Sequence, residues 1–186
     1  MASTFTTQLE PGRLWRITER STAGLRVSVL GSVPDPSRAL RGELTSGSLR
    51  GEARQRGPVR DLVGTYDAIL FLISPAFAMA LDAFGTKGWG AIPVDIPGVD
   101  NGLSLLVGTG RVGPIIRASE DAPVGDYKFG RFLGTERWDG TDLFVPDNEN
   151  VILVTDNLAA HLRRSHLSNL ELEPAGIEAM PLAGAG

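Results

Sequence analysis

The sequence predicts an α+β fold, in which a mixed sheet of short strands carries two main helices in a duplicated strand–helix–strand arrangement. The chain of 186 residues contains 23 glycines and 12 prolines, which favours many turns and short strands over a helical bundle. Short apolar runs recur along the chain, and two of them lead directly into an amphipathic helix. These two strand–helix–strand units also align with each other without a gap.

The length of the chain predicts one globular domain, which we place at residues 1–174, followed by a frayed tail at 178–186 that lacks periodicity. The absence of cysteine excludes disulfides, thiolate zinc sites and thiol nucleophiles. No apolar run resembles a signal peptide or reaches the length of a membrane span, so we expect a cytoplasmic protein that does not enter the membrane. The net charge of −4 argues against a dedicated nucleic-acid binder.

The first predicted element is an N-terminal hairpin at residues 13–31. Leu25, Val27 and Val29 alternate with polar residues, which is typical of a half-buried strand, and an earlier apolar run around Trp15 supplies its partner.

An Arg/Gly-rich loop follows at residues 34–60. A nucleic-acid-binding arm is one interpretation of this loop, but no aromatic residue is interleaved for base stacking. We therefore interpret it as a solvated loop. The arginines are Arg38, Arg41, Arg50, Arg54, Arg56 and Arg60.

The first strand–helix–strand unit spans residues 68–96. Its initial apolar run, 68–73, is typical of a strand buried on both faces. Ser74 is a good N-cap and Pro75 suits the first helical position. We expect the helix to end at Phe84, because the next residue is a glycine.

The second unit spans residues 151–177. A strand precedes Thr155, which we expect to be the N-cap of a helix over 156–165. Asp156 in the first turn and basic residues in the last turn complement the helix dipole. A final strand is expected to end at Pro174.

The two units align at an offset of 81 residues (153 − 72). The alignment superposes the caps, the apolar helix faces and the strand prolines. It is consistent with an internal duplication, and equally with the pattern that any strand–helix–strand unit needs. The matched residues are Leu72 with Leu153, Ser74 with Thr155, Ala78 with Ala159, Leu81 with Leu162, Pro93 with Pro174 and Ile96 with Ile177.

No motif indicates a cofactor, a metal ion or a catalytic site. The G-x-G-x-x-G spacing at 108–113 is followed by Pro114 and two isoleucines rather than by a helix, so we expect a strand–turn–strand corner there. His161 and His166 are five residues apart, which does not match a zinc-binding helix, and we expect both on the helix surface. The chain lacks a G-x-S-x-G nucleophile elbow.

Residues 139–149 form an acidic stretch. We interpret it as turns between strands, and its charge could also bind a basic partner. A site for a hard cation is a third interpretation, but the EF-hand spacing is absent. Together with two arginines of the 34–60 loop, these acids are our candidate partner-binding residues. The candidates are Asp139, Asp142, Asp147, Glu149, Arg50 and Arg54.

Several segments resemble a known family. GWGAIPVDI, TGRVGPI, WDGTDLFVP and VILVTDNLAAHLRRSHLSNLELEP, together covering much of residues 68–174, are similar to immunity protein family eleven of bacterial polymorphic toxin systems. The most specific part is the W-D-G-x-D-x-F-x-P block at 138–146. The resemblance implies an antitoxin-like protein that binds a cognate protein toxin and catalyses no reaction. It supplies no contact residues.

Toxin neutralisation by tight binding is therefore the function that we expect. Two alternatives stay open at this point. One is a small hydrolase or transferase with an unrecognised site, and the other is a structural or self-assembling protein that uses a sheet edge or the arginine-rich loop.

Overall fold

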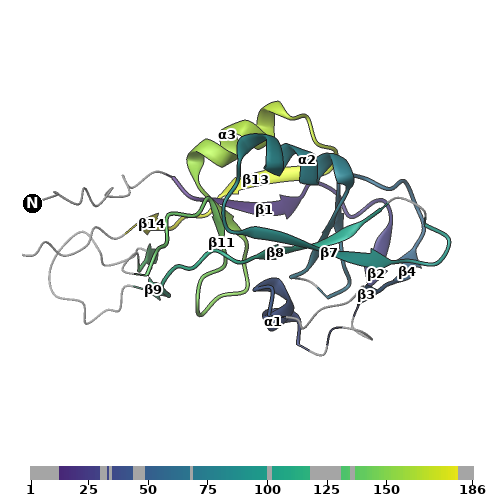
Figure 1. The fold of residues 1–186 in the computed structure, drawn as a ribbon, viewed down its shortest axis with the longest axis horizontal. Coiled ribbons are helices and arrows are strands. Elements are labelled where there is room, and N and C mark those ends of the chain that lie inside the picture. The colour runs from purple at the N-terminus through teal and green to yellow at the C-terminus, as the bar shows by residue number, and fades with distance from the viewer. Residues whose placement is uncertain are drawn as a thin grey trace, which may run out of the picture.

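The computed structural model describes residues 13–29, 33, 35–43, 49–67, 69–99, 102–117, 131–134 and 137–179. Within them the chain forms helices and short strands in mixed sheets, which confirms the predicted α+β class. Figure 1 shows two helices together on one side of the strands and a short third helix on the other side.

The bounds of the elements follow chain order. The helices are α1 (Pro36–Leu40), α2 (Pro75–Phe84) and α3 (Asp156–Arg164). The strands are β1 (Trp15–Glu19), β2 (Arg26–Ser28), β3 (Leu49–Arg50), β4 (Glu52–Gln55), β5 (Leu62–Gly64), β6 (Phe71–Ile73), β7 (Trp89–Asp95), β8 (Ser104–Gly108), β9 (Ile115–Arg117), β10 (Arg131–Leu133), β11 (Leu143–Phe144), β12 (Leu153–Val154), β13 (Leu170–Pro174) and β14 (Glu178–Ala179).

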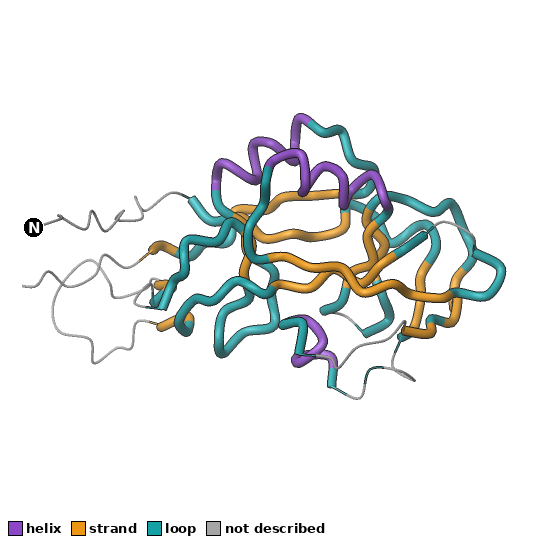
Figure 2. The backbone as a smooth tube through the Cα atoms, viewed as in Figure 1, coloured by secondary structure: helices purple, strands orange, loops and turns teal. Residues whose placement is uncertain are grey.

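Two sheets build the centre of the molecule. One has the order β3-β7-β8-β6-β5, and the other has the order β11-β12-β1-β13. In the first sheet β8 lies antiparallel between β6 and β7, and in the second β1 lies antiparallel between β12 and β13. Helices α2 and α3 pack side by side over these sheets (Figure 2).

The two sheets repeat one design, residue by residue. We name β5, β6, α2, β7 and β8 half 1, and β11, β12, α3, β13 and β1 half 2. The offset of 81 residues relates every element of half 1 to half 2 except β8, whose place is taken by β1 from the start of the chain. The cross-strand partners match as follows: Leu72–Leu105 in half 1 corresponds to Leu153–Arg16 in half 2, Trp89–Gly108 corresponds to Leu170–Glu19, and Leu62–Ile73 corresponds to Leu143–Val154.

The backbone also bends at equivalent points in both halves. Gly85 ends α2 with φ 74°, and its equivalent His166 follows α3 with φ 51°. Gly88 (φ 85°) and Asn169 (φ 66°), before β7 and β13, are likewise equivalent. Non-glycine residues rarely adopt this left-handed region, so the shared bends show that the fold imposes the conformation. The predicted duplicated arrangement is thus present at the level of register and turns.

One hydrophobic core joins the halves. It contains residues from α2 and α3 and from the central strands of both sheets, including Ile17, Leu72, Phe77, Leu105, Leu158 and Leu162. A second, smaller cluster lies where β9, β10 and β11 meet; its buried residues are Leu14, Val112, Ile115, Leu133, Phe144, Leu153 and Ile177.

The predicted hairpin at 13–31 is wrong. β1 pairs with β12 and β13, while β2 pairs with β4. Period-two alternation shows which face of a strand is buried, but it does not identify the neighbouring strand.

The 34–60 segment is not wholly a loop, because it contains α1, β3 and β4. The carboxylate of Asp35 accepts from the backbone N–H groups of Ser37 and Arg38 and so caps α1. At the other end of the chain, the start of the expected frayed tail forms β14, which pairs in parallel with β10. Residues 180–186 lie outside the described part.

Two expectations about the second helix are met in part. Thr155 occupies the N-cap position, as expected, but makes no side-chain capping bond. His166 is exposed, whereas His161 is half-buried, since it packs against Phe84 and its Nε2 donates to the carbonyl of Ala80 at 2.9 Å. Ala80 is its equivalent in half 1, so the two halves meet here around a local two-fold relation.

Candidate functional site

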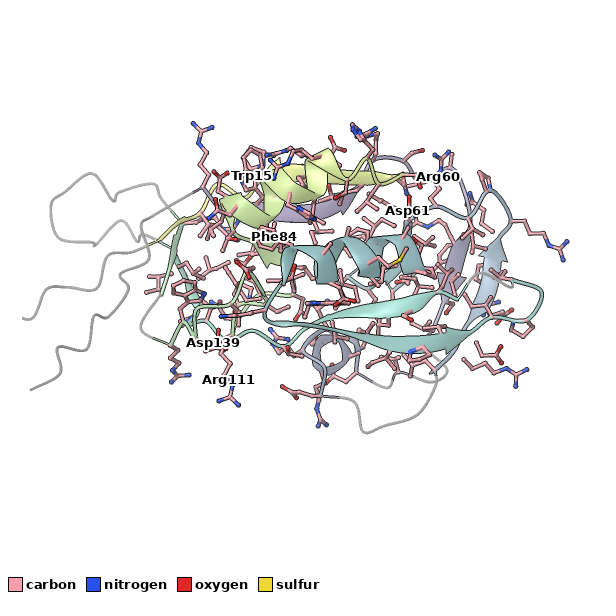
Figure 3. The ribbon with its side chains drawn as sticks, turned by 45° about the horizontal axis from the view of Figure 1, so that its top comes forward. Trp15, Arg60, Asp61, Phe84, Arg111 and Asp139 are labelled. Atoms are coloured by element: carbon pink, nitrogen blue, oxygen red, sulfur yellow. The ribbon has the colours of Figure 1, made fainter. Side chains whose placement is uncertain are left out.

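An open cleft of about 750 Å³ lies beside the end of β8. It brings together two segments that the sequence analysis marked as contact regions, namely the start of the 34–60 segment and the acidic stretch. Its lining residues are Arg41, Glu43, Gly108, Thr109, Gly110, Arg111, Val112, Arg137, Val145 and Asp147. Figure 3 shows Arg111 and Asp139 close together near this end of the molecule, far from Asp61.

Arg41 builds one wall of the cleft. It follows α1, and its Nη1 donates to the carbonyl of Ser37 (2.9 Å) and to the side-chain oxygen of Asn150 (3.0 Å). Its Nη2 donates to the carbonyls of Pro146 (2.8 Å) and Glu149 (3.1 Å). One guanidinium thus fixes the loop at 146–150 against α1, as the planar donor geometry of arginine allows.

The predicted acidic residues already have partners within the chain. Asp147 pairs with Arg137 at 3.2 Å, and Glu149 pairs with Arg131. The carboxylate of Asp139 accepts from the backbone N–H groups of Arg111 (3.0 Å) and Thr141 (3.2 Å), which forms an Asx turn.

The fourth predicted acid, Asp142, joins the two halves. Its Oδ2 accepts from the backbone N–H of Lys87 in half 1 at 3.2 Å, and the Thr155 hydroxyl lies 3.5 Å from its Oδ1. The equivalent residue in half 1, Asp61, makes the reciprocal bonds, accepting from the Ser74 hydroxyl (2.6 Å) and from both the N–H (2.8 Å) and the hydroxyl (2.7 Å) of Ser168 in half 2.

The pKa of the Asp61 carboxyl is displaced from its ordinary value. Partial burial by itself raises the pKa of the Asp61 carboxyl, but the hydrogen bonds from Ser74 and Ser168 together outweigh it and hold the pKa below its usual range. Asp61 and Asp142 therefore form equivalent hydrogen bonds that hold the two halves together.

The two predicted arginines do not join the acids. Arg50 lies on β3 and Arg54 on β4, at the opposite end of the molecule from β9 and β11 (Figure 1). Arg54 forms an exposed ion pair with Glu52 at 2.9 Å, a type of contact that contributes little to stability.

Sequence reasoning missed Arg111, Arg137 and Gly108 as lining residues. Arg111 and Gly108 belong to the turn that was correctly predicted as a strand–turn–strand corner, because β8 ends at 108 and β9 begins at Ile115. The available signal was an arginine at a glycine-rich corner beside the WDG block, but which segment faces that corner depends on the tertiary fold.

The described residues contain no group of three or more histidine or acidic side chains placed to hold a metal ion. None of the helices in the described ranges combines the length and the apolar character that crossing a membrane requires. Comparisons with models of known protein families and with curated protein sequences found no match.

Proposed function

We propose that this chain is the immunity protein of a bacterial polymorphic toxin system, which neutralises a cognate toxin in the cytoplasm by direct stoichiometric binding and without catalysis. The observation that carries the proposal is the cleft, where arginines from three separate segments meet at an open surface. Arginine is enriched in protein–protein interfaces because its planar group makes several directed hydrogen bonds.

The roles of the residues in the WDG block agree with this proposal. The indole N–H of Trp138 donates to the carbonyl of Thr141 at 3.1 Å, and Asp139 and Asp142 complete turns and the joint between the halves. These residues hold the scaffold, so the recognition of a particular toxin falls to the surface that the scaffold presents. That division between scaffold and variable surface is common in binding proteins.

The test is co-expression of the gene with the gene that lies beside it. We expect the neighbour to encode a toxin, the two proteins to co-purify in a one-to-one complex, and the growth of the host to be restored. A toxic neighbour that neither binds this chain nor is suppressed by it would contradict the proposal.

The Arg111→Glu variant tests whether the toxin binds at the cleft. It is expected to weaken the complex, since charge reversal at an interface leaves an unfavourable contact. The matched control is Arg164→Ala, which changes an exposed arginine on α3, on the other side of the sheets from α1 (Figure 1).

A further inference from the structure

The repeat within the chain offers an internal comparison for the cleft. At one contact between the halves, the carboxylate of Glu19 on β1 packs directly over Gly64 on β5 and accepts from Nη1 of Arg26 at 2.7 Å. Both side chains are 17% exposed, so this ion pair is well shielded from water. Nη2 of the same arginine donates to the carbonyl of Thr65 at 3.1 Å.

The equivalent contact between the halves, at the end of β8, has an arginine but no carboxylate. Gly108 is equivalent to Glu19, and Val145 is equivalent to Gly64. Pro146 is equivalent to Thr65, and its carbonyl accepts from Nη2 of Arg41 at 2.8 Å. A guanidinium thus reaches the equivalent carbonyl from a different segment, and the cleft lies beside Gly108 and Val145.

The charges around the cleft also indicate that a carboxylate is missing there. Among the described residues Arg41 bonds only to neutral oxygen atoms, and the guanidinium of Arg111 has no hydrogen-bond or ion-pair partner. The acids that line the cleft already have cationic partners, because Glu43 pairs with Arg38 and Asp147 pairs with Arg137. Two guanidinium groups therefore face the cleft without a carboxylate.

We propose that the cleft receives a carboxylate from the partner, namely the Asp or Glu side chain of an acidic segment, which the guanidinium groups of Arg41 and Arg111 bind. The inference rests on the proposed function and specifies the partner's chemistry. Carboxylate–guanidinium hydrogen bonds are among the strongest in proteins and frequently bidentate.

The first experiment titrates the full chain with a synthetic hexapeptide of alternating glutamate and glycine, followed by NMR at low salt, and compares it with the same peptide containing glutamine. We expect the glutamate peptide to bind saturably. The affinity of the glutamine peptide should be lower by a factor of about ten or more. Arg111→Ala should weaken the glutamate peptide about tenfold, while Arg164→Ala should leave it unchanged. Equal binding of both peptides, no saturation, or an unaffected Arg111→Ala variant would overturn the inference.

A second experiment supplies the missing carboxylate from the chain itself. A Cβ at Gly108 would lie 2.7 Å from Cγ2 of Val145, so the substitution needs room. The double variant Gly108→Glu/Val145→Gly recreates the arrangement of Glu19 over Gly64, and Val145→Gly alone is its control. We expect the double variant to lose peptide binding and the control to keep it. If the folded double variant binds as the control does, the inference is wrong.

The toxin separates the two proposals. If the neighbouring toxin binds wild type and the double variant equally well, the carboxylate site fails while the immunity function stands. If the glutamate peptide binds through Arg111 but no toxin is bound or suppressed, the site stands and the immunity function fails.

Discussion

Replacing Asp61 tests whether the paired aspartates hold the two halves together. Asp61→Ala removes three hydrogen bonds to a carboxylate, at 2.6, 2.7 and 2.8 Å. A hydrogen bond to a charged group contributes about 1.5–3 kcal/mol. The three share one partly exposed group, so water replaces part of the loss and the terms do not add. We expect a loss of about 2–3 kcal/mol in the free energy of unfolding.

Urea denaturation at neutral pH measures this loss, and a thermal melt should show a fall of about 5–10 °C for a chain of this size. Asp61→Asn should cost nearly as much, because both carboxylate oxygens accept bonds and an amide offers only one acceptor. Asp142→Ala is the matched comparison. Its bonds are longer, at 3.2 and 3.5 Å, so we expect about 1 kcal/mol. A loss below about 0.5 kcal/mol for Asp61→Ala, or an equal loss for Asp142→Ala, would refute the reasoning.

The pKa of Asp61 adds a pH dependence with a defined sign. Because its folded pKa is lowered, the unfolded chain binds the proton more tightly. The contribution of this carboxylate to stability is therefore complete above the unfolded value of about 4 and is lost as the pH falls through the lower, folded value. Urea midpoints between pH 6 and pH 2 should fall less steeply for Asp61→Asn than for wild type. Parallel curves would contradict this.

Three further predictions follow from local geometry. His166→Gly should raise the free energy of unfolding by about 0.5–1 kcal/mol in urea, because φ is 51° there, whereas Gly85→Ala at the equivalent position should lower it by about 1 kcal/mol. Arg41→Ala should speed amide hydrogen exchange in the 146–150 loop without changing exchange in α2. Ser74→Ala should cost about 1–2 kcal/mol in thermal melts, since its hydroxyl caps α2 and bonds Asp61.

The main helices could be predicted from sequence because their signals are local. The predicted bounds Pro75–Phe84 agree with the structure, because Ser74 and Pro75 mark the start of the helix and Gly85 marks its end. The second helix ends at Arg164, one residue before its expected end, where Ser165 takes the C-cap position. Helix ends fray and are assigned to within a residue or two.

Strand partners could not be predicted in the same way. β1 occupies the place of β8, and Trp15 corresponds to Ser104 at a spacing different from the 81 residues that relate the other elements. A gapless comparison therefore missed it. In addition, pairing between distant segments depends on which strand completes the buried sheet, and the alternation of one strand carries no information about that choice.

Of the candidate residues predicted from the sequence, Asp147 lines the cleft, while the others do not. The acids of the 139–149 stretch were conspicuous by composition, yet each one is used within the chain. The cleft exists because Arg41 folds α1 against the 146–150 loop, a contact between residues more than 100 positions apart. An exposed guanidinium such as that of Arg111 gives no signal until its surroundings are known.

The position of β1 in the middle of the second sheet has a consequence for how the chain is made. Half 1 is contiguous and has all of its strands once residue 108 has left the ribosome. Half 2 cannot close until residue 174 emerges, so β1, the first strand in the described part of the chain, must wait for β12 and then β13 before it is paired on both sides. Such non-local pairing slows folding and exposes strand edges to aggregation. We expect half 1 to gain protection from hydrogen exchange first during refolding, with β1 and β13 becoming protected together at the end.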